Sequence, residues 1–189
     1  AAAAQFLSRY GLVLRGGFSF APEEERPAGP SGAPARSVLL VGNAGAGYWK
    51  HFSPWRETQP ANLPNPLDTW SRAIAGRIAA DAGARLVMPS DRPHAPFQQW
   101  AMRAENLKPS PLGILLHRRY GLWHGYRGAL GFSSEIDSAQ AGEEVGPEKA
   151  RVWEEACAAA CPAGAVTAAG FDAPPLCAAH LIRCRSESG

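Results

Sequence analysis

The sequence has little of what marks membrane, secreted or nucleic-acid-binding proteins. No apolar stretch approaches the roughly 18 residues needed to span a bilayer, and the Ala-rich start has neither the charged region nor the apolar core of a secretory signal. Lysine occurs at only three positions, Lys50, Lys108 and Lys149, and the net charge is +2. Without a basic block, no nucleic-acid partner is expected. We also expect no membrane partner, and a cytoplasmic location.

Two common catalytic motifs are also missing. The chain contains neither a Gly-x-Ser-x-Gly nucleophile elbow nor a His-Glu-x-x-His metal helix. Hydrophobic residues make up 46% and charged residues 19%, which is the balance of a folded globular protein and not of a disordered one. A chain of 189 residues can hold one buried domain of about 130 to 150 residues and a short appendage.

The order of apolar patterns predicts one domain of helices and strands, α/β or α+β, over residues 1–133. We expect a bulged edge strand at Gly16-Gly17 and a buried central strand over 37–41. Helices should end near Ser8 and begin at Pro66 and near Pro96. The other expected strands cover 85–88, 114–116 and 123–132, the last two forming a hairpin or lying side by side.

Two features of this domain have alternative interpretations. The run Gly42-Asn-Ala-Gly45-Ala-Gly47 follows a strand like a phosphate-binding loop, but its spacing fits neither the dinucleotide fingerprint nor the P-loop, so we interpret it as a tight turn. The helical aromatic residues Trp70, Phe97 and Trp100 either form the far wall of a pocket or belong to the core.

All four cysteines lie close to the end of the chain, between Cys157 and Cys184. Residues 134–147 are polar and glycine-containing, so we expect a linker there, followed by a Cys-rich tail over 148–189 with helices near 148–160 and 175–183. Four cysteines can pair as two disulfides in a secreted protein. The lack of a signal segment favours reduced thiols and therefore a metal site.

The segment from His117 to Gly128 is unusually dense in aromatic, basic and glycine residues. Its aromatic faces suit the stacking of a flat cofactor, and Arg127 suits pairing with a phosphate or carboxylate. The candidate cofactor-binding residues are His117, Trp123, His124, Tyr126 and Arg127. In the alternative interpretation Trp123 and Tyr126 are core residues, Arg127 neutralises a buried carboxylate, and each histidine is an ordinary hydrogen-bonding residue.

The pattern His-x-x-x-Gly-x-Trp-x-x-x-Arg-Gly in this segment resembles the CblC cobalamin-processing family. The resemblance covers about twenty residues. It implies a nitroreductase-like α+β fold, with a mixed sheet flanked by helices, that holds a corrinoid, or a flavin, against the sheet.

The tail carries a second resemblance. Cys157-Ala-Ala-Ala-Cys161-Pro162 is similar to the closing half of a bacterial ferredoxin cluster motif. With Asp172 and the run Cys177-Ala-Ala-His-Leu181, it resembles the ferredoxin module of epoxyqueuosine reductases, which join a corrinoid-holding domain to two four-iron clusters. The chain as a whole resembles a bacterial group of ferredoxin-like proteins built in the same order.

The tail departs from this pattern in its ligands. Counting back from Cys161, the two missing thiolates of a complete motif fall at Arg151 and Glu154. With four thiols, at most one four-iron cluster is possible, held by Cys157, Cys161, Cys177 and Cys184. Zinc is an alternative, because Cys177, His180 and Cys184 with one further cysteine have suitable ligand types and spacing. Free thiols in a degenerate module are the third possibility.

These observations predict a redox protein, an oxidoreductase if it is an enzyme. An iron–sulfur tail would transfer electrons to a cofactor held by the α+β domain, with a redox partner protein or a small molecule as the other participant. One alternative is a protein that binds or transports a corrinoid or flavin and has a structural tail. Another is a non-catalytic domain stabilised by zinc. The sequence names no catalytic residue, substrate or oligomeric state.

Overall fold

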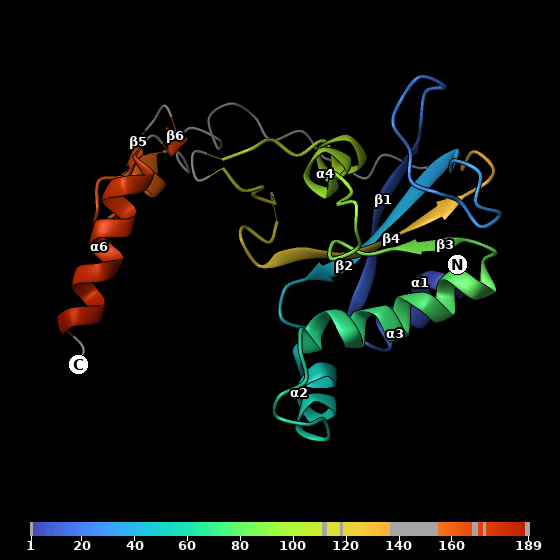
Figure 1. The fold of residues 1–189 in the computed structure, drawn as a ribbon, viewed down its shortest axis with the longest axis horizontal. Helices are drawn as coiled ribbons and strands as arrows, with labels where there is room; N and C mark the ends of the chain where they lie inside the picture. The colour runs from blue at the N-terminus through green and yellow to red at the C-terminus, as the bar shows by residue number, and fades with distance from the viewer. Residues whose placement is uncertain are drawn as a thin grey trace. The chain divides into compact units, whose positions relative to one another are not determined.

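The computed structural model describes residues 2–110, 113–117, 119–136, 155–167, 170–171 and 173–187. It shows an α+β protein whose elements form two compact units (Figure 1). The first unit comprises Ala1–Leu107 with Arg119–Gly142, and the second comprises Lys108–Arg118 with Glu143–Gly189.

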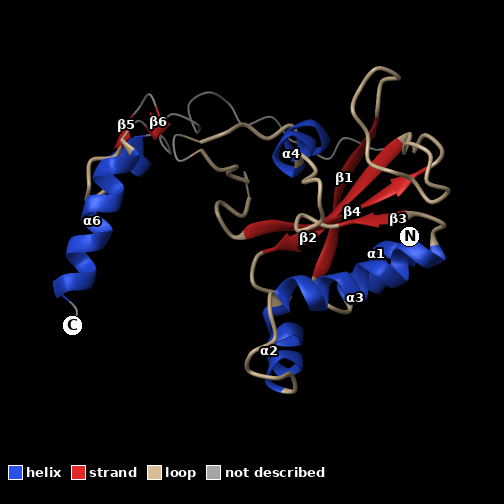
Figure 2. Ribbon diagram, viewed as in Figure 1, coloured by secondary structure: helices blue, strands red, loops and turns tan. Residues whose placement is uncertain are grey.

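A four-stranded sheet forms the centre of the first unit (Figure 2). The strands stand in the order β1 (Leu12–Ser19), β2 (Ser37–Ala44), β4 (His124–Phe132) and β3 (Arg85–Val87). Every pairing between them is antiparallel. The prediction of a mixed sheet was therefore wrong. β2 and β3 point the same way, but β4 lies between them and is antiparallel to both.

The predicted central strand and the predicted bulged edge strand are confirmed. β2 lies between β1 and β4, and its Val38, Leu40 and Val41 are fully buried, as expected of a strand covered on both faces. β1 lies at the edge, and its pairing with β2 is irregular between Leu14 and Gly17. Gly16, one of the two residues inside this irregularity, has φ +70°, a conformation that glycine adopts without strain.

Three helices lie on one side of the sheet: α1 (Ala2–Ser8), α2 (Trp49–Glu57) and α3 (Pro66–Asp81). α3 begins at Pro66 as predicted, where a missing N–H costs no hydrogen bond. Asn65 precedes it in the left-handed conformation and makes no capping hydrogen bond through its side chain.

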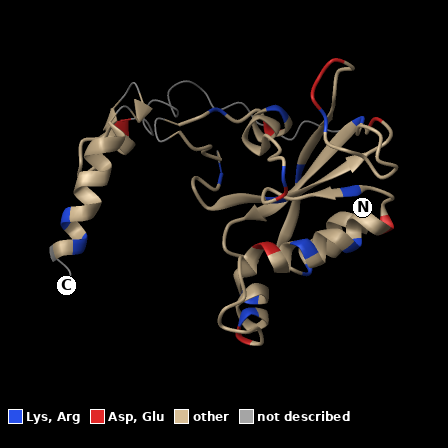
Figure 3. Ribbon diagram, in the orientation of Figure 1, with Lys and Arg blue, Asp and Glu red and all other residues tan. Residues whose placement is uncertain are grey.

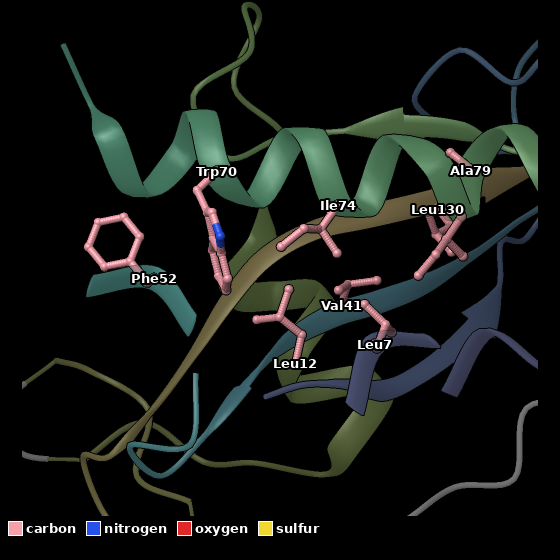
Figure 4. Packing of buried hydrophobic residues seen from close by; sticks show 9 residues of the cluster. Leu7, Leu12, Val41, Phe52, Trp70, Ile74, Ala79 and Leu130 are labelled. Atoms are coloured by element: carbon pink, nitrogen blue, oxygen red, sulfur yellow. The ribbon is translucent and has the colours of Figure 1, made fainter. Parts of the chain in front are cut away.

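The main hydrophobic core lies between these helices and the sheet (Figure 4). From α3, Trp70 and Ile74 point toward Leu12 and Val41 on the strands. Helical positions three and four residues apart share one face, so α3 presents a continuous apolar side to the sheet. Trp70 is thus a core residue.

The opposite face of the sheet carries α4 (Phe97–Glu105), which packs on β1. The helix begins next to Pro96, as predicted. Phe97 and Trp100 are buried on this side, and Trp100 meets the ring of Phe20 edge to face with a centroid distance of 5.9 Å. Trp70 and Trp100 therefore belong to cores on opposite faces of the sheet, which confirms the core interpretation over a shared pocket wall.

The predicted strand over residues 114–116 was wrong. Of these residues, Leu115 forms only an isolated bridge with Pro109, and the described part of the segment contains no strand. Gly113 has φ +71°, and the backbone N–H of Ser110 donates to the Ile114 carbonyl at 2.9 Å. The chain thus turns back over 110–114 and uses in a turn the groups that a strand would need for pairing.

The described residues of the second unit form small elements. They are a helical stretch over 155–160, the short hairpin β5 (Val166–Thr167) and β6 (Gly170–Phe171), and α6 (Pro174–Glu187). α6 confirms the predicted helix at 175–183 and is longer. Residues 148–154 of the other predicted helix, and residues 137–147 of the predicted linker, lie outside the described residues.

Charged residues of both signs are interspersed along the elements of the first unit, as Figure 3 shows. α3, for example, carries Asp68 and Asp81 together with Arg72 and Arg77. In the described ranges, no helix has both the length and the apolar character that a bilayer crossing requires.

Candidate functional site

A buried arginine–glutamate pair joins β1 to the end of α4. The side chains of Arg15 and Glu105 are only 3% and 7% exposed. Nε and Nη2 of Arg15 each donate to one carboxylate oxygen of Glu105 at 2.7 Å, and Nη1 donates to the Asn43 carbonyl at 2.9 Å. This two-bond geometry is the strongest form of the Arg–carboxylate pair. It ties α4 to two strands at once.

Two residues of β4 extend this pair into a larger cluster. The Tyr126 hydroxyl donates to Glu105 Oε2 and lies 3.3 Å from Arg15 Nη2, which is also 3.2 Å from His124 Nδ1. Because a guanidinium can only donate, this contact is a hydrogen bond when His124 Nδ1 carries no proton. We call these four residues, Arg15, Glu105, His124 and Tyr126, the buried polar cluster.

The hydroxyl of Tyr126 stays protonated in this cluster. Burial raises the pKa of Tyr126 far above its usual value; the Arg15 charge opposes this rise, and the bond to the Glu105 carboxylate adds to it. Tyr126 is therefore a hydrogen-bond donor at every physiological pH.

Arg127 lies on the face of the sheet opposite the buried polar cluster, toward Tyr48 and α3. It is the extra residue of β4 where the pairing with β2 passes from Val41–Gly128 to Gly42–Tyr126. A residue inserted at such a bulge has no cross-strand partner, and the strand bends around it.

The surroundings of Arg127 are aromatic and only weakly acidic. Its Nε donates to Asn43 Oδ1 at 3.0 Å, and its Cζ lies 5.8 Å from the centre of the Tyr48 ring. Burial lowers the pKa of Arg127, while Tyr48 and Asp68 act in the opposite direction. The guanidinium has thus lost part of its hydration.

The structure places the five predicted cofactor-binding residues in four different settings. His124 and Tyr126 belong to the buried polar cluster, and Arg127 lies on the opposite face. Trp123 is 75% exposed, and His117 lies in the segment 108–118 that belongs to the second unit. The alternative that Arg127 neutralises a buried carboxylate finds no support among the described residues, whose buried carboxylate, Glu105, is paired with Arg15.

Sequence reasoning missed Arg15 and Glu105. A signal was present, since Arg15 is a charged residue inside an otherwise apolar strand and Glu105 ends an amphipathic helix. Neither position shows by itself that the two side chains meet, because they are 90 positions apart. The contribution of Asn43 to both Arg15 and Arg127 had no sequence signal.

The four cysteines lie in the second unit as thiols, without a disulfide between them. Cys157, Cys161 and Cys177 are partly buried, whereas Cys184 is exposed. In α6 the positions 177, 180 and 184 fall on one side of the helix, and Cys184 Sγ lies 3.5 Å from His180 Nε2. In the described ranges, no three His, Cys, Asp or Glu side chains gather as a metal-ligand set.

Cys161 begins a turn that favours its thiolate form. The turn is closed by the Gly164 N–H, which donates to the Cys161 carbonyl at 3.2 Å, and Gly164 has φ +62°. The backbone N–H groups of Val166 and of residues 163–165 lie around the sulfur and lower the pKa of the Cys161 thiol, while burial acts in the opposite direction. Backbone donors around a thiolate are also what tunes cysteine-bound metal clusters.

We expect Cys161 to be alkylated at lower pH in the folded protein than in the urea-unfolded protein. The reactive species is the thiolate, so a lowered pKa moves the midpoint of the rate against pH downward. Iodoacetamide labelling followed by peptide mass spectrometry measures this midpoint for each cysteine. Gly164→Ala, which strains the turn, should move the midpoint back toward the unfolded value. Equal midpoints for Cys161 in both states would contradict the assignment.

Comparison of the sequence with protein-family models and with curated proteins finds no match to either.

Proposed function

We propose that this chain is a ferredoxin-like redox protein whose second unit binds a metal or iron–sulfur centre through its thiols. One observation carries this proposal. In the second unit Cys157, Cys161, Cys177 and His180 are partly buried, while the larger apolar side chains Leu176, Leu181 and Ile182 are exposed. Although Cys184 is exposed, the partial burial of the other sulfur and imidazole groups beside exposed leucines supports a unit organised around ligands and not around a hydrophobic core.

The small amount of buried apolar surface in this unit supports the same conclusion. Among its described residues, only Ala165 and Val166 are buried apolar side chains. Small units with so little core are usually stabilised by disulfides or by a metal, and no disulfide joins these cysteines.

The ligand set fits one centre and not two four-iron clusters. Cys157, Cys161, Cys177 and Cys184 would be the thiolate ligands, and positions 151 and 154, outside the described residues, hold Arg and Glu in the sequence. An iron–sulfur centre supplies one-electron transfer when bound. This chain would contribute deprotonated thiols and the N–H groups of the Cys161 turn, with a redox partner protein or a small molecule on the other side of the reaction.

We expect anaerobically purified protein to contain iron and acid-labile sulfide, and to show broad visible absorbance that dithionite bleaches. Elemental analysis and absorbance spectroscopy measure both properties. Cys161→Ser and Cys177→Ser should each lower the metal content, whereas the matched control Ser186→Ala on α6 should not. Iron-free, colourless protein would contradict the redox proposal.

The same analysis tests the zinc alternative, which the contact of 3.5 Å between His180 and Cys184 favours. Nitrogen and sulfur ligands one helical turn apart suit a tetrahedral zinc site. Stoichiometric zinc without iron would identify a structural centre. Protein with neither metal would leave only the free-thiol interpretation.

A second candidate function, the binding of a flat corrinoid or flavin cofactor, concerns the first unit. The observation that favours it is the exposure of Trp123 on the segment that leads into β4. Large exposed aromatic side chains provide stacking surface for planar ligands. In this case the second unit would be structural.

A further inference from the structure

We infer that the first unit binds an oxyanion, the phosphate or carboxylate of a ligand with a planar ring, at Arg127 beside the turn over residues 45–48. This inference rests on the second candidate function and names the group by which such a cofactor would be held.

Arg127 forms no ion pair with a described carboxylate, and Asp68 acts on it only from beyond ion-pair distance. Its one hydrogen bond to a described residue goes from Nε to Asn43 Oδ1, and none of the described carboxylates lies within ion-pair distance of it. Arg36, Arg72 and Arg103 are more exposed to water than Arg127, and each of them pairs with a carboxylate. A guanidinium that is partly removed from water and lacks a counter-charge is costly unless a ligand supplies one.

The guanidinium is also held in position. Asn43 fixes its Nε edge, and its Cζ lies over the ring of Tyr48. Gly125 makes room for it, since a Cβ at this position would lie 3.1 Å from Arg127 Nη2 and 3.2 Å from Asn43 Oδ1. With Nε occupied, the Nη1 and Nη2 hydrogens are the pair that remains for a two-bond contact with an oxyanion.

Aromatic side chains border the same turn and indicate a ring on the ligand. The Trp123 carbonyl accepts from the Gly45 N–H at 2.6 Å, and the Trp49 N–H donates to the Ala46 carbonyl at 3.0 Å. Both tryptophans are more than half exposed. Exposed indoles at two positions that adjoin this turn suit a planar ring, and Arg127 supplies a cation for an anionic group on it.

The test compares ligands that differ only in the oxyanion. FMN and riboflavin share one ring system with and without phosphate, and 2-naphthoate and 2-naphthol form the corresponding carboxylate pair. We expect at least one anionic ligand to bind the wild-type protein about tenfold to a hundredfold more tightly than its neutral parent. Titration calorimetry measures the dissociation constants, and the pair that shows the difference identifies phosphate or carboxylate.

Arg127→Gln should abolish this difference, and Arg36→Gln, which removes the same charge from an exposed ion pair, should retain it. If Arg127→Gln does not fold, the wild-type protein decides the question: the advantage of the anion should shrink in concentrated NaCl and under competition by inorganic phosphate or acetate. An advantage that survives both treatments, or that persists in Arg127→Gln, would overturn the inference.

Two further outcomes separate this inference from the function on which it rests. Equal binding of the anionic and neutral ligands would overturn the Arg127 site and leave cofactor binding intact. Binding of none of these ligands would overturn the Arg127 site, and failure to bind cobalamin as well would overturn the function on which it rests. The metal content of the second unit is measured independently and is unaffected by either result.

Discussion

Glu105→Gln should lower the free energy of unfolding of the first unit by about 3–5 kcal/mol, the range measured when one partner of a buried ion pair is removed. The change keeps the shape of the side chain and removes its charge, so Arg15 remains buried without a counter-ion. Tyr126 loses its carboxylate acceptor at the same time. Urea unfolding followed by circular dichroism measures the loss as a lower midpoint with an unchanged slope.

The matched control is Glu135→Gln. Glu135 pairs with Arg36, but both side chains are more than half exposed, and exposed pairs contribute about 0–1 kcal/mol. A second comparison replaces both buried charges, in Arg15→Met with Glu105→Leu, and should recover much of the stability that the single change loses. If Glu105→Gln and Glu135→Gln behave alike, the buried polar cluster is hydrated and does not hold α4 on the sheet.

The elements that local sequence determines were predictable. α3 has its proline at the first position and its apolar residues at helical spacing, and β2 is a short apolar run, so both followed from backbone preferences and burial. The strand expected over 114–116 failed for an equally local reason, because Gly113 turns the chain before pairing can begin. The mixed sheet failed because strand direction depends on where β4 inserts, which is not a local property.

The candidate site was less predictable, because a motif continuous in sequence is not continuous in space. Neighbouring residues of a strand point to opposite faces, so Tyr126 joins Arg15 and Glu105 on one side while Arg127 meets Tyr48 on the other. The role of Arg127 as a cation that binds an anion stays a prediction. Its true neighbours, Asn43 and Tyr48, come from β2 and the turn after it, and only the fold brings them together.

In the second unit the placement of residues within one helix was predictable, whereas the convergence of separate elements was not. The spacing of Cys177, His180 and Cys184 predicts one helical face, and the helix α6 has them there, with His180 and Cys184 side by side. Convergence with Cys157 and Cys161 depends on how separate elements fold around a ligand. Metal binding and folding are one equilibrium in such units, so spacing alone cannot specify the final geometry.

Gly42→Ala should destabilise the first unit by about 3 kcal/mol or more, or prevent folding, because overpacking against rigid backbone has no easy relief. A Cβ at position 42 would lie 2.1 Å from the Gly125 carbonyl oxygen on β4 and 3.1 Å from Arg15 Cγ. The first contact forces β2 and β4 apart at the centre of the sheet. The second contact displaces Arg15, which contacts the three other residues of the buried polar cluster.

Gly47→Ala is the control, since a Cβ there meets no atom within 4 Å. Thermal unfolding should show a midpoint several degrees lower for Gly42→Ala and close to the wild type for Gly47→Ala. Because Gly42 makes room for Arg15, the losses from Gly42→Ala and Glu105→Gln should not add: once Arg15 is displaced, removing its partner costs less. Strict additivity in this double-mutant cycle would mean that Gly42 affects only the packing of β2 against β4, and that the buried polar cluster forms independently of it.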